Sequence, residues 1–121
     1  MSIEDDLREL LAPNTGIPVY SRQFPQSLPE SYCIQRIGGR TNSSNIRREV
    51  AFISIMACAS RLETAKEHLD FARNFFTTHL PTDINGRHYY LGTALADGEI
   101  MLRPPRHAYI YHVTLEVTAE L

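Results

Sequence analysis

Histidine and cysteine are the side chains that most often bind metal ions or act as nucleophiles, and in this chain they are scattered. The five histidines fall on different predicted helices, strands and loops, at His68, His79, His88, His107 and His112. They form no HxxxH or HExxH pattern, and no histidine stands near a cysteine at the spacing of a metal site. We therefore expect no metal ligands and no cofactor-binding residues.

The two cysteines, Cys33 and Cys58, lie inside apolar runs, where small buried hydrophobic residues are also found. Cys58 stands between two alanines, and no neighbouring cation would activate it as a nucleophile. This pattern favours free, buried thiols in a reducing compartment. Ser60 belongs to no GxSxG motif and is interpreted as a helix cap. The sequence thus predicts no catalytic residue and no enzymatic activity.

Arginine dominates the basic side chains, because Lys66 is the one lysine among twelve Lys and Arg residues. Four arginines surround a predicted hairpin loop with one acid beside them, and these residues are Arg36, Arg40, Arg47, Arg48 and Glu49. Arginine pairs bidentately with carboxylates and is enriched at protein interfaces. The arginines therefore predict a basic contact surface, although genome composition is an alternative explanation for them.

The first residues of the chain are acidic. Glu4, Asp5, Asp6 and Glu9 outnumber Arg8 in this segment. A basic and an acidic surface on one molecule are what head-to-tail contact between identical copies uses. We therefore expect Glu4, Asp5 and Asp6 to be candidate partners for the arginines.

The elements that position these residues follow from a change in hydrophobic period at Ser60. The run from Arg47 to Ala59 alternates with period 2, which predicts a strand. From Arg61 to His79 the period is about 3.6, with a seam at Leu62, Ala65, Leu69, Ala72, Phe76 and Leu80. Ser60 and Glu63 match a capping box at the start of this helix.

The remaining segments complete an α-β-β-β-α-β-β order in a single domain, residues 1–121. A helix is expected over 2–12, capped by Ser2, and strands over 17–22, 32–37, 87–96 and 109–118. Residues 38–45 and 82–86 are expected as loops, and 100–102 as a short strand or an apolar loop. Gly38-Gly39-Arg40 lacks the phosphate-loop pattern GxxxxGK[ST] and fits a hairpin connection better.

This order predicts an α+β fold, a mostly antiparallel sheet with one long helix packed on one face. The strand over 47–59 would span about 43 Å, whereas a globule of this size measures roughly 35 Å across. The hairpin should therefore project. On the strand over 87–96 we expect Tyr89, Leu91 and Thr93 on one face. On the last strand the odd-numbered residues from Tyr109 to Val117 should face the core.

Composition excludes several functions. The chain has 121 residues, 43% hydrophobic and 21% charged, with a formal net charge of −2. This balance argues against nonspecific nucleic-acid binding. No basic signal-peptide start and no apolar run of roughly 20 residues is present, so no membrane association is expected. The protein is expected inside a cell or in an assembly made there.

The layout of the whole chain resembles a family. The short first helix, "PVYSRQFPQSLPESYCIQRIGG", the Arg-flanked strand leading into the long helix, and "LRPPRHAYIYHVTLEV" together resemble tail terminator and minor capsid (head-tail joining) proteins of long-tailed bacteriophages. The resemblance is one of layout and composition and includes no short diagnostic motif. It brings no catalytic residues, and it implies virion assembly in a bacterial host cytoplasm, from a virus or a prophage.

The resemblance also implies partners. Such proteins form a ring, expected here as a hexamer, that ends tail-tube polymerisation and gives the head connector or completion protein a docking surface. DNA passes through as cargo. Contact residues are then expected at the hairpin and at the Pro-Pro loop, namely Arg40, Arg47, Arg48, Arg103 and Arg106, with the acidic first helix as partner.

Three alternatives remain open at this point. The chain could be a cellular α+β module binding a small ligand beside Tyr89, Tyr90, Tyr109 and Tyr111. It could be a neighbouring head-tail neck protein of the same size and layout. A small enzyme using His112 or Cys58 is the third.

Overall fold

The computed structural model describes residues 2–22, 30–41, 48–96, 100–103 and 108–120. In these ranges the elements are α1 (Ile3–Leu11), a 3₁₀ turn (Ala12–Asn14), β1 (Val19–Ser21), β2 (Ser31–Thr41), β3 (Arg48–Ala59), α2 (Leu62–His79), β4 (Thr82–Ile84), β5 (Arg87–Ala96), β6 (Ile100–Arg103) and β7 (Ala108–Glu120). The predicted order is confirmed, with β4 and β6 as short additions. None of the helices in these ranges has the length and apolar character needed to cross a membrane.

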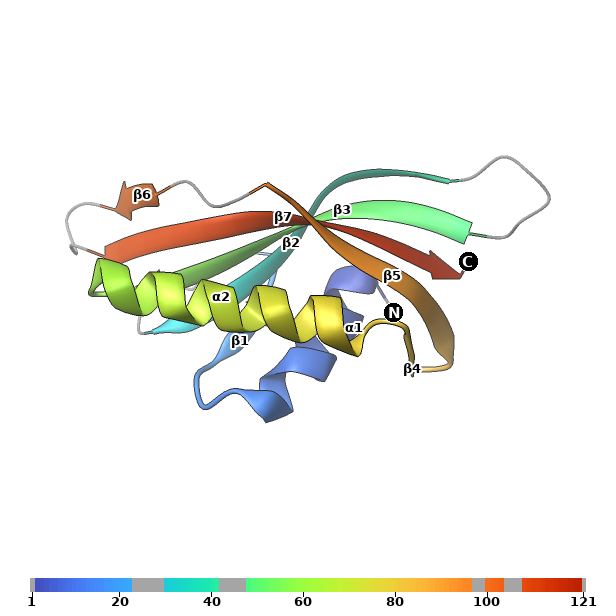
Figure 1. The fold of residues 1–121 in the computed structure, drawn as a ribbon, viewed down its shortest axis with the longest axis horizontal. Helices are drawn as coiled ribbons and strands as arrows, with labels where there is room; N and C mark the ends of the chain where they lie inside the picture. Colours follow the sequence, from blue (N-terminus) through green and yellow to red (C-terminus); the bar gives the residue numbers. More distant parts are fainter. Residues whose placement is uncertain (1, 23–29, 42–47, 97–99, 104–107, 121) are drawn as a thin grey trace.

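All the strands belong to one curled sheet, and both helices lie on the same face of it (Figure 1). The strand order is β1-β2-β3-β7-β5-β4, and β6 pairs with the beginning of β7. β1 and β2 run parallel, and the other paired strands of the described chain are antiparallel. The predicted α+β class with a mostly antiparallel sheet is therefore confirmed.

One hydrophobic core fills the space between the sheet and the helices. β3 and β7 alternate into it with fully buried side chains, including Ile53, Ile55, Val113, Leu115 and Val117. The buried residues of α2 are Ala65, Leu69, Ala72, Phe75 and Phe76. All but Phe75 belong to the predicted seam, which confirms the helical period over this segment.

The two helices begin differently from one another. Ser2 caps α1 as predicted, because its hydroxyl accepts a hydrogen bond from the Asp5 backbone N–H at 3.2 Å. The capping box predicted at Ser60 and Glu63 is wrong. α2 begins at Leu62, so the cap position falls on Arg61, whose side chain makes no capping hydrogen bond. Ser60 lies one residue too early to reach the first free N–H groups of the helix.

β2 continues beyond its predicted end, so the loop expected from residue 38 is wrong for residues 38–41. Gly38 to Thr41 pair with β3 after a register shift at Ile37. Gly39 makes this possible with φ at +149°, where a Cβ atom would lie 2.5 Å from the Val50 carbonyl oxygen. Glycine alone tolerates both features. The rest of the expected loop, residues 42–45, lies outside the described residues.

The segment predicted as a loop over 82–86 forms a hairpin instead. β4 pairs with the beginning of β5, and the turn Asn85-Gly86 has positive φ at both residues, 51° and 79°. Such a two-residue turn matches the twist of paired strands. The bounds of β5 agree with the prediction, but its faces do not. A register shift between Tyr89 and Leu91 buries Tyr89 and leaves Thr93 exposed.

The ends of β2, β3 and β7 that lie toward the β2–β3 connection extend past the end of α2 (Figure 1). β3 has 12 residues, and all of them pair with β7 on one side. On the other edge β2 follows β3 as far as Glu49. This sheet end is called the arginine end below, because Arg36, Arg40 and Arg48 belong to it.

Candidate assembly interface

The arginine end contains an ion-pair group that joins three strands. Arg36 of β2 and Arg87 of β5 approach the two carboxylate oxygens of Glu49 on β3, at 3.3 and 3.4 Å. The Glu49 side chain is 15% exposed, so one largely shielded carboxylate serves two guanidinium groups. The group therefore keeps a net positive charge. The sequence did not single out Arg87, because the strand order that places β5 near β3 is not visible in local patterns.

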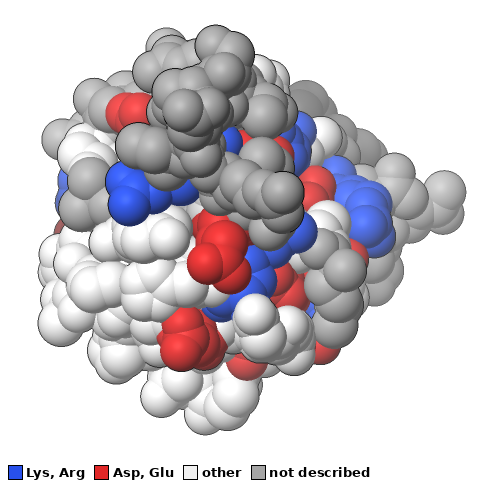
Figure 2. Space-filling model, turned by 90° about the vertical axis from the view of Figure 1, so that its right-hand side faces the viewer, with Lys and Arg blue, Asp and Glu red and all other residues white. Residues whose placement is uncertain are grey.

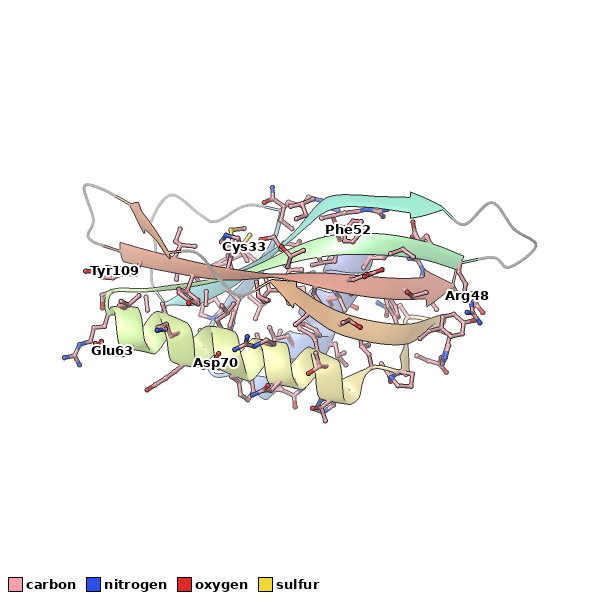
Figure 3. The ribbon with its side chains drawn as sticks, turned by 45° about the horizontal axis from the view of Figure 1, so that its top comes forward. Cys33, Arg48, Phe52, Glu63, Asp70 and Tyr109 are labelled. Carbon is pink, nitrogen blue, oxygen red and sulfur yellow. The ribbon has the colours of Figure 1, made fainter. Side chains whose placement is uncertain are left out.

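Arg48 makes a different contact at the same end. Its guanidinium carbon lies 4.1 Å from the centre of the Tyr90 ring, which is a cation–π geometry. Its Nε atom is buried without a hydrogen-bond partner in the described structure. Figure 3 labels Arg48 at the end of the sheet where β3 begins, and Figure 2 views the molecule from this end, where basic and acidic side chains lie close together. Arg48 is thus partly held by packing.

The structure separates the two groups of predicted contact arginines. Arg40 pairs through its backbone with Val50 at the arginine end, whereas Arg103 of β6 pairs with Ala108 at the start of β7. Arg48 lies opposite Glu120, at the far end of the same strand. The 12 residue steps of β7 span about 40 Å. Arg47 and Arg106 lie outside the described residues.

The acids of α1 are largely engaged within the subunit. Asp5 accepts hydrogen bonds from the hydroxyls of Ser2 at 2.7 Å and Ser21 at 2.8 Å, and pairs with Arg22 at 3.0 Å. These hydrogen bonds, from Ser2 first and then Ser21, together with Arg22 lower the pKa of Asp5. Glu4 lies half-buried on the same helix. The sequence indicated the negative charge but not its local partners.

Asp6 is buried, with 1% of its surface exposed. Its carboxylate accepts hydrogen bonds from the Tyr89 hydroxyl and, at 2.8 Å, from the Asn85 amide. Burial, and then the neighbouring Asp6, raise the pKa of Tyr89 above its ordinary value. In the subunit Asp6 therefore ties α1 to the β4–β5 hairpin.

A cavity of about 280 Å³ opens beside α2, at the beginning of β2. Its lining comes from three separate segments: Asn14, Thr15, Gly16, Tyr32, Glu67, His68 and Phe71. The Tyr32 hydroxyl donates to the His68 carbonyl at 2.6 Å, and the His68 ring lies 2.9 Å from a Glu30 oxygen. Phe71 is 45% exposed although it is a large hydrophobic residue. Sequence patterns could not indicate this cavity, because its segments meet only in the folded chain.

The other residues considered for chemistry do not converge. Cys33 and Cys58 are buried and form no disulfide, as predicted, and burial raises the pKa of Cys33 to about 11. The tyrosines considered for a ligand site have different surroundings. The Tyr89 hydroxyl contacts Asp6 of α1, whereas the centre of the Tyr111 ring lies 5.7 Å from the Lys66 Nζ atom of α2. Among the residues with described positions, no three His, Cys, Asp or Glu side chains gather as metal ligands.

Comparison with known proteins shows the fold. No protein-family model and no curated protein matches the sequence. Among solved structures, the chain is similar to a chain in the virion of a native gene transfer agent particle, with a TM-score of 0.71. The alignment covers 99% of this chain and 96% of that chain, at 11% sequence identity. The two chains therefore share one fold over almost their whole lengths.

Proposed function

We propose that the protein is a structural component of a phage-like virion. In this proposal it forms a ring, expected to be a hexamer, at the head-tail junction. The ring ends tail-tube polymerisation and gives the head connector a docking surface, and it catalyses no reaction. The observation that carries the proposal is the end-to-end fold similarity to a chain of a gene transfer agent virion. The layout of the sequence supports the same role independently.

The open sheet supports association between copies. β1 pairs with β2 as far as Ile34, and β4 pairs with β5 as far as Tyr89. After Ile34, the outer edge of β2 has no partner strand in the described chain, and the same holds for the outer edge of β5 after Tyr89. Unpaired strand edges readily pair with other chains. Because the two edges lie on opposite sides of one sheet, they suit head-to-tail contacts, which close into rings.

The contact residues belong to the proposal. We assign the basic side to Arg36, Arg40, Arg47, Arg48, Arg103 and Arg106. Of the predicted acids, Glu4 keeps a place in the proposal, whereas Asp5 and Asp6 are engaged within the subunit. DNA passes through the ring without being held tightly, since strong phosphate contacts would hinder its transit.

Electron microscopy of the purified protein with tail tubes tests the function. We expect a ring at one end of each tube and tubes that no longer elongate when fresh tube subunits are added. A ring bound to head connectors but absent from tube ends would assign the protein to a neighbouring neck position. A stable monomer that leaves tube growth unchanged would overturn the proposal.

A further inference from the structure

The arginine end needs an acidic counterpart, and α1 offers little. Asp5 is paired with Ser2, Ser21 and Arg22, and Asp6 is buried against Tyr89. The cavity beside α2 provides an alternative, because Glu67 lines it and is exposed. We propose that this cavity receives an arginine from the arginine end of a second copy. The inference deepens the proposed ring function and rests on it.

The charge of α2 favours such a guest. Glu67 has no ion-pair partner in the described part of the chain, and it stands one helical turn from Glu63, where like charges repel. The cations of the helix are directed elsewhere, since Lys66 lies over the Tyr111 ring and Arg73 pairs with Asp70. An incoming guanidinium would therefore relieve a repulsion that the subunit itself leaves uncompensated.

The cavity wall suits the shape of a guanidinium group. Phe71 lines the cavity with a ring that is 45% exposed, whereas the Tyr32 ring is fully buried and fixed by its hydrogen bond to the His68 carbonyl, so Phe71 supplies the aromatic face. A planar cation between an aromatic face and a carboxylate combines cation–π attraction with an ion pair. Arginine uses both contacts better than lysine does.

A single subunit does not fill its own cavity. Tyr32 lies near the beginning of β2 and Arg40 near its end, with eight residue steps between them. Eight steps of a strand span about 26 Å. The cavity and the arginine end are therefore at opposite ends of one rigid strand. A contact between them joins different copies head to tail, which is the geometry of a ring.

Cysteine crosslinking tests the contact directly. Ile37→Cys, exposed at the arginine end, carries a size tag and is mixed with untagged Phe71→Cys, so that the arginines of that end and Glu67 stay in place, and a short bismaleimide is added. Cys33 and Cys58 are fully buried and should not react. The control is Thr78→Cys, exposed on the same side of α2 about 10 Å further along. We expect several-fold more tagged-untagged dimer with Phe71→Cys than with Thr78→Cys. Equal yields would overturn the inference.

Charge reversal separates this inference from the proposed function. Glu67→Arg should lose the crosslink between Ile37→Cys and Phe71→Cys, and Asp83→Arg, exposed on β4 outside the cavity, should keep it. If tube-end rings form with no such crosslink, the function stands and the cavity contact is wrong. If the crosslink forms but no ring is seen on tubes, the contact stands and the assembly has another role.

Discussion

The carboxylate of Asp6 lies inside the protein, although the first turn of a helix is a position that solvent usually reaches. Its partners Tyr89 and Asn85 are 83 and 79 residues away in sequence. The sequence predicted the acidic first turn correctly from the helix dipole. It could not distinguish Asp5 from Asp6, because long-range pairing decides which acid is buried.

Removing the Tyr89 hydroxyl should destabilise the fold. Tyr89→Phe leaves the buried Asp6 carboxylate with one donor fewer, which should lower the free energy of unfolding by about 1–3 kcal/mol. Tyr32→Phe is the matched control, because Tyr32 donates to the uncharged His68 carbonyl. We expect about 1 kcal/mol there. Urea unfolding of both variants measures the difference, and equal losses would contradict the assigned role of Asp6.

Asp5 should make stability depend on acid pH. Its pKa is lowered in the folded state, so its contribution is present above the unfolded-state pKa of about 4 and is lost as pH falls through the lower folded value. Asp5→Asn should therefore be less stable than wild type near pH 7, and the two should converge below about pH 3. Thermal unfolding across this pH range measures the difference in stability between Asp5→Asn and wild type. A difference that grows in acid would refute the assignment.

At the scale of elements, hydrophobic period predicted α2, β3 and most of β7 well, because these segments bury one face against the main core. The start of β7 differs from the prediction, since Tyr109 is half-buried and Ile110 is buried in a second cluster with Cys58. The errors fall where pairing between segments decides the structure. Gly38 to Thr41 look like loop residues but are recruited into β2 by β3. Residues 82–84 gain strand structure from the neighbouring β5. Turn chemistry and period describe local preference, and such preference yields to a partner strand.

Gly39 should be essential to the long β2–β3 pair. Gly39→Ala forces a Cβ toward the Val50 carbonyl oxygen at a φ that side chains rarely adopt, and should cost about 1–3 kcal/mol. Gly16→Ala is the control, because no atom lies within 4 Å of the position of its new Cβ. Chemical denaturation compares the two. A neutral Gly39→Ala would show that the strand end is not paired in solution.

The seam of α2 gives a second prediction at this scale. Leu69 is 1% exposed, and Leu69→Ala should leave a cavity that costs about 2–5 kcal/mol. Phe71→Ala removes a larger side chain that is 45% exposed, so it should cost clearly less despite its size. Denaturant unfolding curves with equal m-values allow the free energies of unfolding of the two variants to be compared from their midpoints. The reverse ranking would mean that α2 packs with a different face.

At the scale of the whole molecule, the sheet has two ends that lie far apart. β3 and β7 run from the arginine end to the opposite end, where β6 pairs with the beginning of β7 (Figure 1). Both helices cover the same face of the sheet between them. The sequence predicted this projecting shape from the length of one strand. It could not predict the ion-pair group of Arg36, Glu49 and Arg87, because that depends on the order of strands in the sheet. The rigid strands make the spacing between the two ends a fixed property of each copy.

The arginine end should matter for assembly far more than for folding. Replacing Arg47 and Arg48 together by glutamate should abolish binding to tail tubes, because it reverses two charges at a proposed contact. Arg48 also packs over Tyr90, so the double variant should lose about 0.5–1 kcal/mol of stability. Tube binding seen by electron microscopy, together with thermal unfolding, measures both effects.

Arg61→Glu is the control for this pair, because Arg61 is exposed at the start of α2, at the other end of β3. It carries the same charge change per site and should bind tubes normally. Arg48→Ala should reproduce the stability loss without reversing charge, which separates packing from contact. A folded double variant that still caps tubes would remove the arginine end from the interface, since no loss of structure would then explain the result.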